Sequence, residues 1–134
     1  MSNKLQVFKE DRLNIKMKTH KDLTVWQKSI EFVTLIYEIT SKFPPEEKFG
    51  LSNQLRRASV SVPSNIAEGA ARKGKTEFKQ YLYIALGSAS EIETQLIIAK
   101  NLNLINNDLH VKLNDEIIEI RKMLNGLIKA IKSN

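Results

Sequence analysis

The residues of this chain with the least ordinary chemistry lie between positions 51 and 96, in a stretch whose pattern is otherwise apolar and helical. Polar and small side chains interrupt that pattern at Asn65, Glu68, Gly69, Ser88 and Glu91. Such groups form either a hydrogen-bonded layer that fixes helix register or the lining of a recognition pocket. We interpret these five residues as a structural polar layer, with the pocket as the alternative.

Positive charge is concentrated in residues 56–79, where six basic residues face only two acidic ones: Arg56, Arg57, Arg72, Lys73, Lys75 and Lys79. Arg72 and Lys73 suit the C-terminal end of a helix, where the helix dipole favours cations, so a solvated helix end is one explanation. Lys75 and Lys79 open the next helix, where the dipole disfavours them, and an external anion explains them better. We predict that the six residues bind nucleic-acid phosphates through charge, without a base-reading motif.

The histidines and serines do not have the spacing of a known catalytic site. Metal-binding four-helix bundles use Glu-x-x-His pairs on facing helices, and neither His20 nor His110 has a glutamate three residues before it. The chain has no Gly-x-Ser-x-Gly elbow and no glycine-rich phosphate loop. We therefore expect a protein that is not an enzyme and that has no catalytic residues, metal ligands or cofactor.

Helices must position these side chains, because apolar residues recur at the helical period along most of the chain. The predicted helices cover residues 23–43, 51–72, 75–101 and 109–131. Two prolines at 44–45 end the first helix, and an asparagine-rich segment separates the last two. Four long helices joined by short turns predict an all-α, up-and-down four-helix bundle.

Three local features are expected within this bundle. Pro63 predicts a kink or a local break in the second helix, because proline supplies no amide proton. Asp22 or Thr24 is expected to cap the first helix, with Thr24 opening a capping box. Gly74 is expected to take the left-handed backbone conformation that ends many helices.

Some small and apolar residues predict contacts that the four-helix core does not need. Gly69 and Gly87 each cost a helix interior up to about 1 kcal/mol relative to alanine, so another helix should approach closely there, or the helix should bend. Ile84, Ile98 and Leu102 fall outside the expected core stripe of the third helix. A monomer would leave this apolar surface exposed, so we predict that the chain forms an oligomer.

Composition sets the outer bounds. The chain has 134 residues, 42% of them hydrophobic, and a net charge of +6. This predicts one bundle domain at residues 22–134, preceded by a basic arm at 1–21. There is no cysteine, no apolar segment long enough to span a membrane and no signal-peptide pattern, so we expect a protein of the reducing cytoplasm.

Several short motifs together resemble one bacterial family. They include Trp26, the Phe43-Pro44 turn, Phe49-Gly50-Leu51, the set Gln54, Arg56, Arg57 and Ala58, the segment Val62 to Gly69, and the run Tyr83 to Glu91. From Leu23 to Leu127 the chain resembles the four-helix proteins encoded by intervening sequences within 23S ribosomal RNA genes, also called the S23 ribosomal protein family. These are similar to the accessory protein of diversity-generating retroelements.

The resemblance implies an assembly and partners. It implies a ring, typically a homopentamer, that associates with nucleic acid, more with RNA than with DNA, and with a reverse transcriptase as a further partner. It brings no catalytic residues to this chain. The predicted function is therefore that of a non-enzymatic, nucleic-acid-associated homo-oligomeric bundle. The alternative is a protein-interaction scaffold that does not bind nucleic acid directly.

Overall fold

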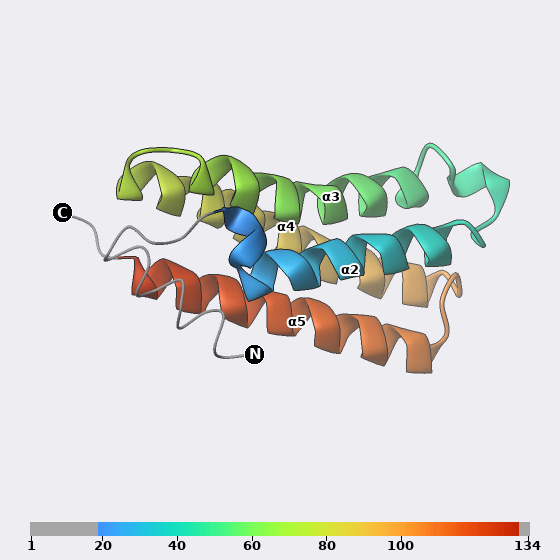
Figure 1. Ribbon diagram of the computed structural model, residues 1–134. Coiled ribbons are helices and arrows are strands. Elements are labelled where there is room, and N and C mark those ends of the chain that lie inside the picture. Colours follow the sequence, from blue (N-terminus) through green and yellow to red (C-terminus); the bar gives the residue numbers. More distant parts are fainter. Residues whose placement is uncertain (1–18, 132–134) are drawn as a thin grey trace.

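The computed structural model describes residues 19–131, which fold into four long helices in chain order (Figure 1). These are α2 (Thr24–Thr40), α3 (Leu51–Ala70), α4 (Lys75–Asn101) and α5 (Asn107–Ala130), with short 3₁₀ helices at His20–Asp22 and Pro45–Glu47. Each long helix packs against two others, since α3 contacts α2 and α4 while α5 contacts α4 and α2. The described chain is the up-and-down four-helix bundle that the sequence predicts.

The core fills the space between the four helices. Its largest fully buried side chains come from every helix, and they include Ile36, Leu55, Phe78 and Leu124. Helix α4 buries residues along almost its whole length, from Phe78 to Ala99. Burial of one face of each helix supplies most of the folding free energy, because isolated helices are marginal in water.

The turns lie at opposite ends of the bundle. Residues 71–74 join α3 to α4 at one end, and residues 41–50 join α2 to α3 at the other, beside the turn between α4 and α5 (Figure 1). Helix α3 has 20 residues, so its axis is about 30 Å long. Groups at the two ends of α3 are therefore far apart in the folded chain.

The start of α2 differs from the prediction. Leu23 occupies the N-cap position with no side-chain hydrogen bond, and Thr24 is the first, buried residue of the helix. The capping box lies one element earlier, at His20–Asp22, where the Thr19 hydroxyl accepts from the Lys21 backbone N–H at 3.1 Å. The predicted cap is wrong because Leu23 is drawn completely into the core and the backbone there is extended.

Two other expectations are corrected at the helix ends. Gly74 is extended, with φ −90° and ψ 141°, and serves as the N-cap of α4 instead of ending α3 in the left-handed conformation. Among the described residues, the left-handed conformation occurs at Asn103, with φ 61°. Asparagine adopts this conformation more readily than most residues, and Asn103 lies directly after α4 has ended.

Pro63 does not interrupt the second helix. Helix α3 is continuous from Leu51 to Ala70, and Pro63 is buried within it. The alternative of a local break is therefore wrong, whereas the kink stays a prediction. Within residues 19–131, no helix is both long enough and apolar enough to cross a membrane.

Candidate nucleic-acid interface

The six basic residues predicted to contact phosphates fall into two groups along the bundle. Arg56 and Arg57 lie in the first half of α3, whereas Arg72 and Lys73 follow its last residue. Sixteen residues separate Arg56 from Arg72, which is about 24 Å along a helix axis. The fold therefore offers two separate basic groups.

In the turn between α3 and α4, Arg72 is already engaged within the chain. Its Nη2 donates to Glu68 Oε2 at 2.8 Å and to the Tyr81 hydroxyl at 2.7 Å, and its guanidinium lies 5.0 Å from the Tyr81 ring centre. The Tyr81 oxygen, and after it the Glu68 carboxylate, raises the pKa of Arg72 above its ordinary value. Arg72 thus joins the two helices, and part of its charge is already compensated.

The lysines of this turn are placed differently. Lys73 is exposed, while Lys75 and Lys79 are half-buried at the start of α4. In the part of the chain that the structure describes, neither Lys73 nor Lys75 forms an ion pair. These two lysines are therefore the charges of the turn that remain available to an outside anion.

The second basic group lies near the other end of α3. Arg56 Nε donates to the Thr40 hydroxyl at 2.8 Å, and its guanidinium lies 4.5 Å from the centre of the Tyr37 ring. Arg57 is exposed beside it. Within residues 19–131, neither arginine pairs with a carboxylate.

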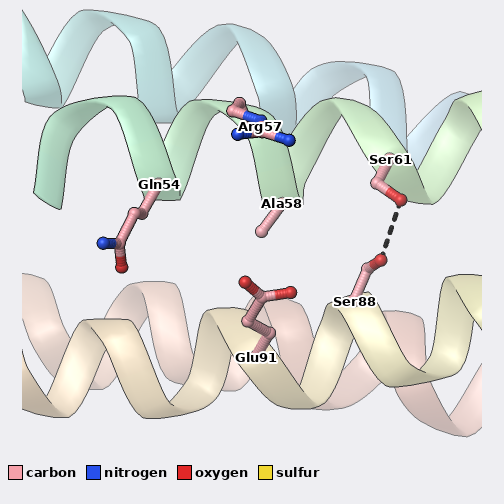
Figure 2. Close-up of a pocket in the computed structure, with 6 residues that line it drawn as sticks. All are labelled: Gln54, Arg57, Ala58, Ser61, Ser88 and Glu91. Carbon is pink, nitrogen blue, oxygen red and sulfur yellow. Dashed lines mark hydrogen bonds between the residues drawn. The ribbon is translucent and has the colours of Figure 1, made fainter. Parts of the chain in front are cut away.

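The seam between α3 and α4 carries much of the predicted polar layer. Ser88 on α4 donates to Ser61 on α3 at 2.8 Å (Figure 2), and Asn65 Nδ2 donates to the Ser61 carbonyl and hydroxyl oxygens at 2.8 and 2.9 Å. Ser61 is the centre of this network. The hydroxyl pair crosses between the helices and so favours one register of α3 against α4.

The two glutamates of the predicted layer are exposed. Glu68 pairs with Arg72 at the end of α3. Glu91 rises from α4 toward Ala58 of α3 and lines a hollow of about 270 Å³ between the helices (Figure 2). Its Oε2 accepts a hydrogen bond from Gln95 at 3.3 Å. Glu68 and Glu91 therefore border the seam, with Asn65 and Ser88 deeper within it.

Gly69 lies at a close contact between α3 and α4. A Cβ atom at this position would lie 2.7 Å from Tyr81 Cβ and 2.9 Å from Phe78 Cδ1, which is too close for real atoms. By contrast, a Cβ atom at Gly87 would have nothing within 4 Å. The sequence predicts close approach of another helix, or a bend, at both glycines; close approach is present at Gly69, and among the described residues it is absent at Gly87.

Neither described histidine belongs to a metal-ligand cluster. His20 packs against Trp26, with ring centres 5.0 Å apart in an edge-to-face arrangement, and His110 is half-buried at the start of α5. Over residues 19–131, no group of three or more His, Cys, Asp or Glu side chains is placed to hold a metal ion.

With this arrangement established, one comparison decides the family. The family model for 23S rRNA-intervening sequence proteins matches residues 21–126. The chain belongs to this family. The match begins just before α2 and ends four residues before the end of α5, so it covers nearly the whole bundle.

A solved structure supports the same family membership. The chain is similar to a protein of unknown function of the S23 ribosomal protein family from Bacteroides thetaiotaomicron VPI-5482, with a TM-score of 0.72 and 29% sequence identity. The similarity covers 79% of this chain and 99% of the other. No functionally curated protein matches the chain. The predicted likeness to the retroelement accessory protein stays a prediction.

Within this family member, the structure brings together several residues that sequence reasoning did not single out. The Tyr37 ring and the Thr40 hydroxyl contact Arg56, and the Tyr81 hydroxyl contacts Arg72. Ser61 lies at the centre of the hydrogen-bonded network between α3 and α4. The contacts of Arg56 and the Ser61–Ser88 pair each join two helices, and the contact of Arg72 joins the turn after α3 to α4. Only the spacing within a helix is visible in a sequence, so no signal there could have paired them.

Proposed function

We propose that this family member is a non-enzymatic cytoplasmic bundle that self-associates, as a homopentamer by its resemblance, and binds nucleic acid, RNA more than DNA. The observation that carries the proposal is an apolar face on α4. Four large side chains on α4 and that of Leu102, which directly follows it, are 42–56% exposed: Tyr83, Ile84, Ile97, Ile98 and Leu102. Exposed apolar surface of this extent on one helix is typical of an interaction site.

A second copy of the chain is the occupant that we propose for this face, because the face needs apolar cover along a rod-shaped helix and the family resemblance implies self-association. Gly87 lies between Ile84 and Ile98 with open space around its Cα, so another helix could approach the backbone there. Nucleic-acid binding is supported by the charges of Arg57, Lys73 and Lys75, which form no ion pair within residues 19–131. A reverse transcriptase remains a further proposed partner on the strength of the resemblance.

The test has two arms. Light scattering at micromolar concentration should give the mass of an oligomer, and fluorescence anisotropy should detect binding to a structured RNA at about 150 mM salt, where surface charges are screened beyond about 8 Å. A monomer mass contradicts the self-association. Oligomer formation without RNA or DNA binding favours the alternative, a protein-interaction scaffold.

A further inference from the structure

Arg56 is held in place before any ligand arrives. Its Nε donates to the Thr40 hydroxyl at 2.8 Å, and that hydroxyl donates in turn to the Ile36 carbonyl oxygen at 2.7 Å. The Arg56 guanidinium lies over the Tyr37 ring, with its carbon 4.5 Å from the ring centre. The hydrogen bond to Thr40 uses Nε, so the two terminal nitrogens of the guanidinium remain available to a ligand. A guanidinium ordered by the fold loses little further entropy when it binds an anion.

Arg56 borders two hollows of the surface. One hollow of about 460 Å³ lies between Arg56, Arg57 and Asn53, and a second of about 280 Å³ lies between Arg56, Lys48 and Ser52. No carboxylate lines either hollow among the described residues, although Arg57 also borders the hollow that Glu91 lines on its other side.

Two exposed aromatic rings lie beside these charges. Phe49 is 86% exposed, the largest exposure among the large hydrophobic residues that the structure describes, and Lys48 Nζ lies 5.5 Å from its ring centre. Tyr37 is 43% exposed and carries Arg56 over its ring. A phenylalanine left in water gives up the stabilisation that burial would provide, and its exposed ring is open to stacking by an external partner.

We propose that these five residues, Tyr37, Lys48, Phe49, Arg56 and Arg57, which we call the Arg56 shelf, bind single-stranded nucleic acid. The basic side chains contact phosphates, while unpaired bases stack on Phe49 and Tyr37. Aromatic rings among basic groups are typical of single-strand binding, because stacking needs bases that are free of a duplex. The inference rests on the proposed nucleic-acid association and names the strand type and the site.

The test uses the full chain and labelled single-stranded and duplex RNA of equal length. Phe49→Ala should weaken single-strand binding roughly 5- to 150-fold, the effect of losing one stacked base, and should leave duplex binding unchanged. The matched control is Val111→Ala, which shortens an exposed apolar side chain on a different element, α5, and should have no effect. Arg57→Gln should lower the slope of log affinity against log salt by about 0.7 on a single strand.

Three results would overturn the inference. The first is that Phe49→Ala and Val111→Ala bind the single strand with equal affinity. The second is that polyglutamate displaces the labelled single strand as effectively as unlabelled RNA does. The third is a fall in oligomer mass of Phe49→Ala without a change in RNA affinity. If Lys73→Gln and Lys75→Gln abolish binding while the shelf variants retain it, only the shelf fails. If the parent chain binds no nucleic acid, the proposed association fails with it.

Discussion

At the scale of single residues, two glycines in neighbouring helices have different reasons to be glycine. Gly69 on α3 faces Phe78 and Tyr81, and the space for its Cβ is already filled by Tyr81. Gly87 on α4 faces open space and is exposed. The first glycine is explained by packing within the chain, whereas the second needs an explanation outside it.

Gly69→Ala should destabilise the fold by about 1 to 3 kcal/mol, because the added methyl group overpacks the contact between α3 and α4. This loss exceeds the gain of up to about 1 kcal/mol from the better helix propensity of alanine. The free energy of unfolding in urea measures the change. Gly126→Ala on α5 is the matched control, since a Cβ there has nothing within 4 Å, and it should stabilise. A more stable Gly69→Ala variant would contradict the packing argument.

Arg72 illustrates how a neighbour changes the role of a predicted ligand. The sequence places it among six phosphate-binding candidates, but its fork already contacts Glu68 and Tyr81. A phosphate would have to compete with both. Arg56 is held by neutral groups only, the Thr40 hydroxyl and the Tyr37 ring, so its full charge remains for a ligand.

At the scale of helices, the sequence predicted the third and fourth helices closely. The predicted range 75–101 is that of α4, and 109–131 differs from α5 by two residues at its start and one at its end. Asn106 explains the start, because its side chain accepts from the Leu109 backbone N–H at 2.8 Å. The first helix was extended too far, since Phe43 continues the apolar period and is buried, although it lies three residues beyond α2.

The contacts between helices could not be predicted in the same way. Helical periodicity shows which face of a helix is buried, but shifting one helix by a single residue rotates its side chains by about 100°. The pairs Arg56 with Tyr37, Arg72 with Tyr81 and Ser61 with Ser88 all depend on that register. The candidate residues were therefore visible in the sequence, while their grouping into two sites was not.

Helices α2 and α5 are joined by one ion pair, between Lys28 Nζ and Glu119 Oε1 at 2.6 Å. The hydrogen bond to Glu119 raises the pKa of Lys28 above its ordinary value of 10.5. The pKa of Lys28 is higher in the folded chain than in the unfolded chain. The pair therefore contributes its full stabilisation from neutral pH up to about pH 10.5, and this contribution is lost as the pH rises through the folded-state pKa of Lys28. The pair is partly exposed, so it contributes less than about 1 kcal/mol.

Lys28→Gln should therefore lower the free energy of unfolding slightly at neutral pH, and the difference from the parent should shrink as the pH rises above 10.5. Because tyrosines also titrate in that range, a double-mutant cycle with Glu119→Gln isolates the pair. A coupling energy that stays constant from neutral pH to the alkaline range would show that the ion pair does not contribute in this way.

The apolar face of α4 leads to a test of self-association at Gly87. A Cβ atom at position 87 has no atom of the described residues within 4 Å, so Gly87→Leu should not lower the free energy of unfolding of an isolated chain. A second copy packed against the backbone there would be pushed away, since overpacking a close contact costs about 1 to 3 kcal/mol. Light scattering should then show a lower mass for Gly87→Leu than for the control Gly126→Leu. An unchanged mass would place the interface elsewhere.

At the scale of the whole molecule, the bundle holds its two basic groups apart. The turn with Lys73 and Lys75 lies beyond one end of α3, and the Arg56 shelf lies near the other, about 24 Å away along the helix axis. A rigid rod with a cationic group near each end suits an extended polyanion better than a small anion. Self-association through α4 would bring several copies of these basic groups together in one assembly.

This arrangement predicts a dependence on strand length. A strand long enough to reach several copies should bind the assembly more tightly than a short strand by roughly 10²-fold or more, because the second contact is intramolecular. The double variant Ile84→Asn and Ile98→Asn places uncharged polar groups on the exposed face of α4, so it adds no charge that a strand could bind, and it should be a monomer in light scattering. It should bind the short strand as the parent does and lose the gain from length. If the monomeric variant keeps the full length dependence, a single chain already spans the strand, and assembly does not contribute to binding.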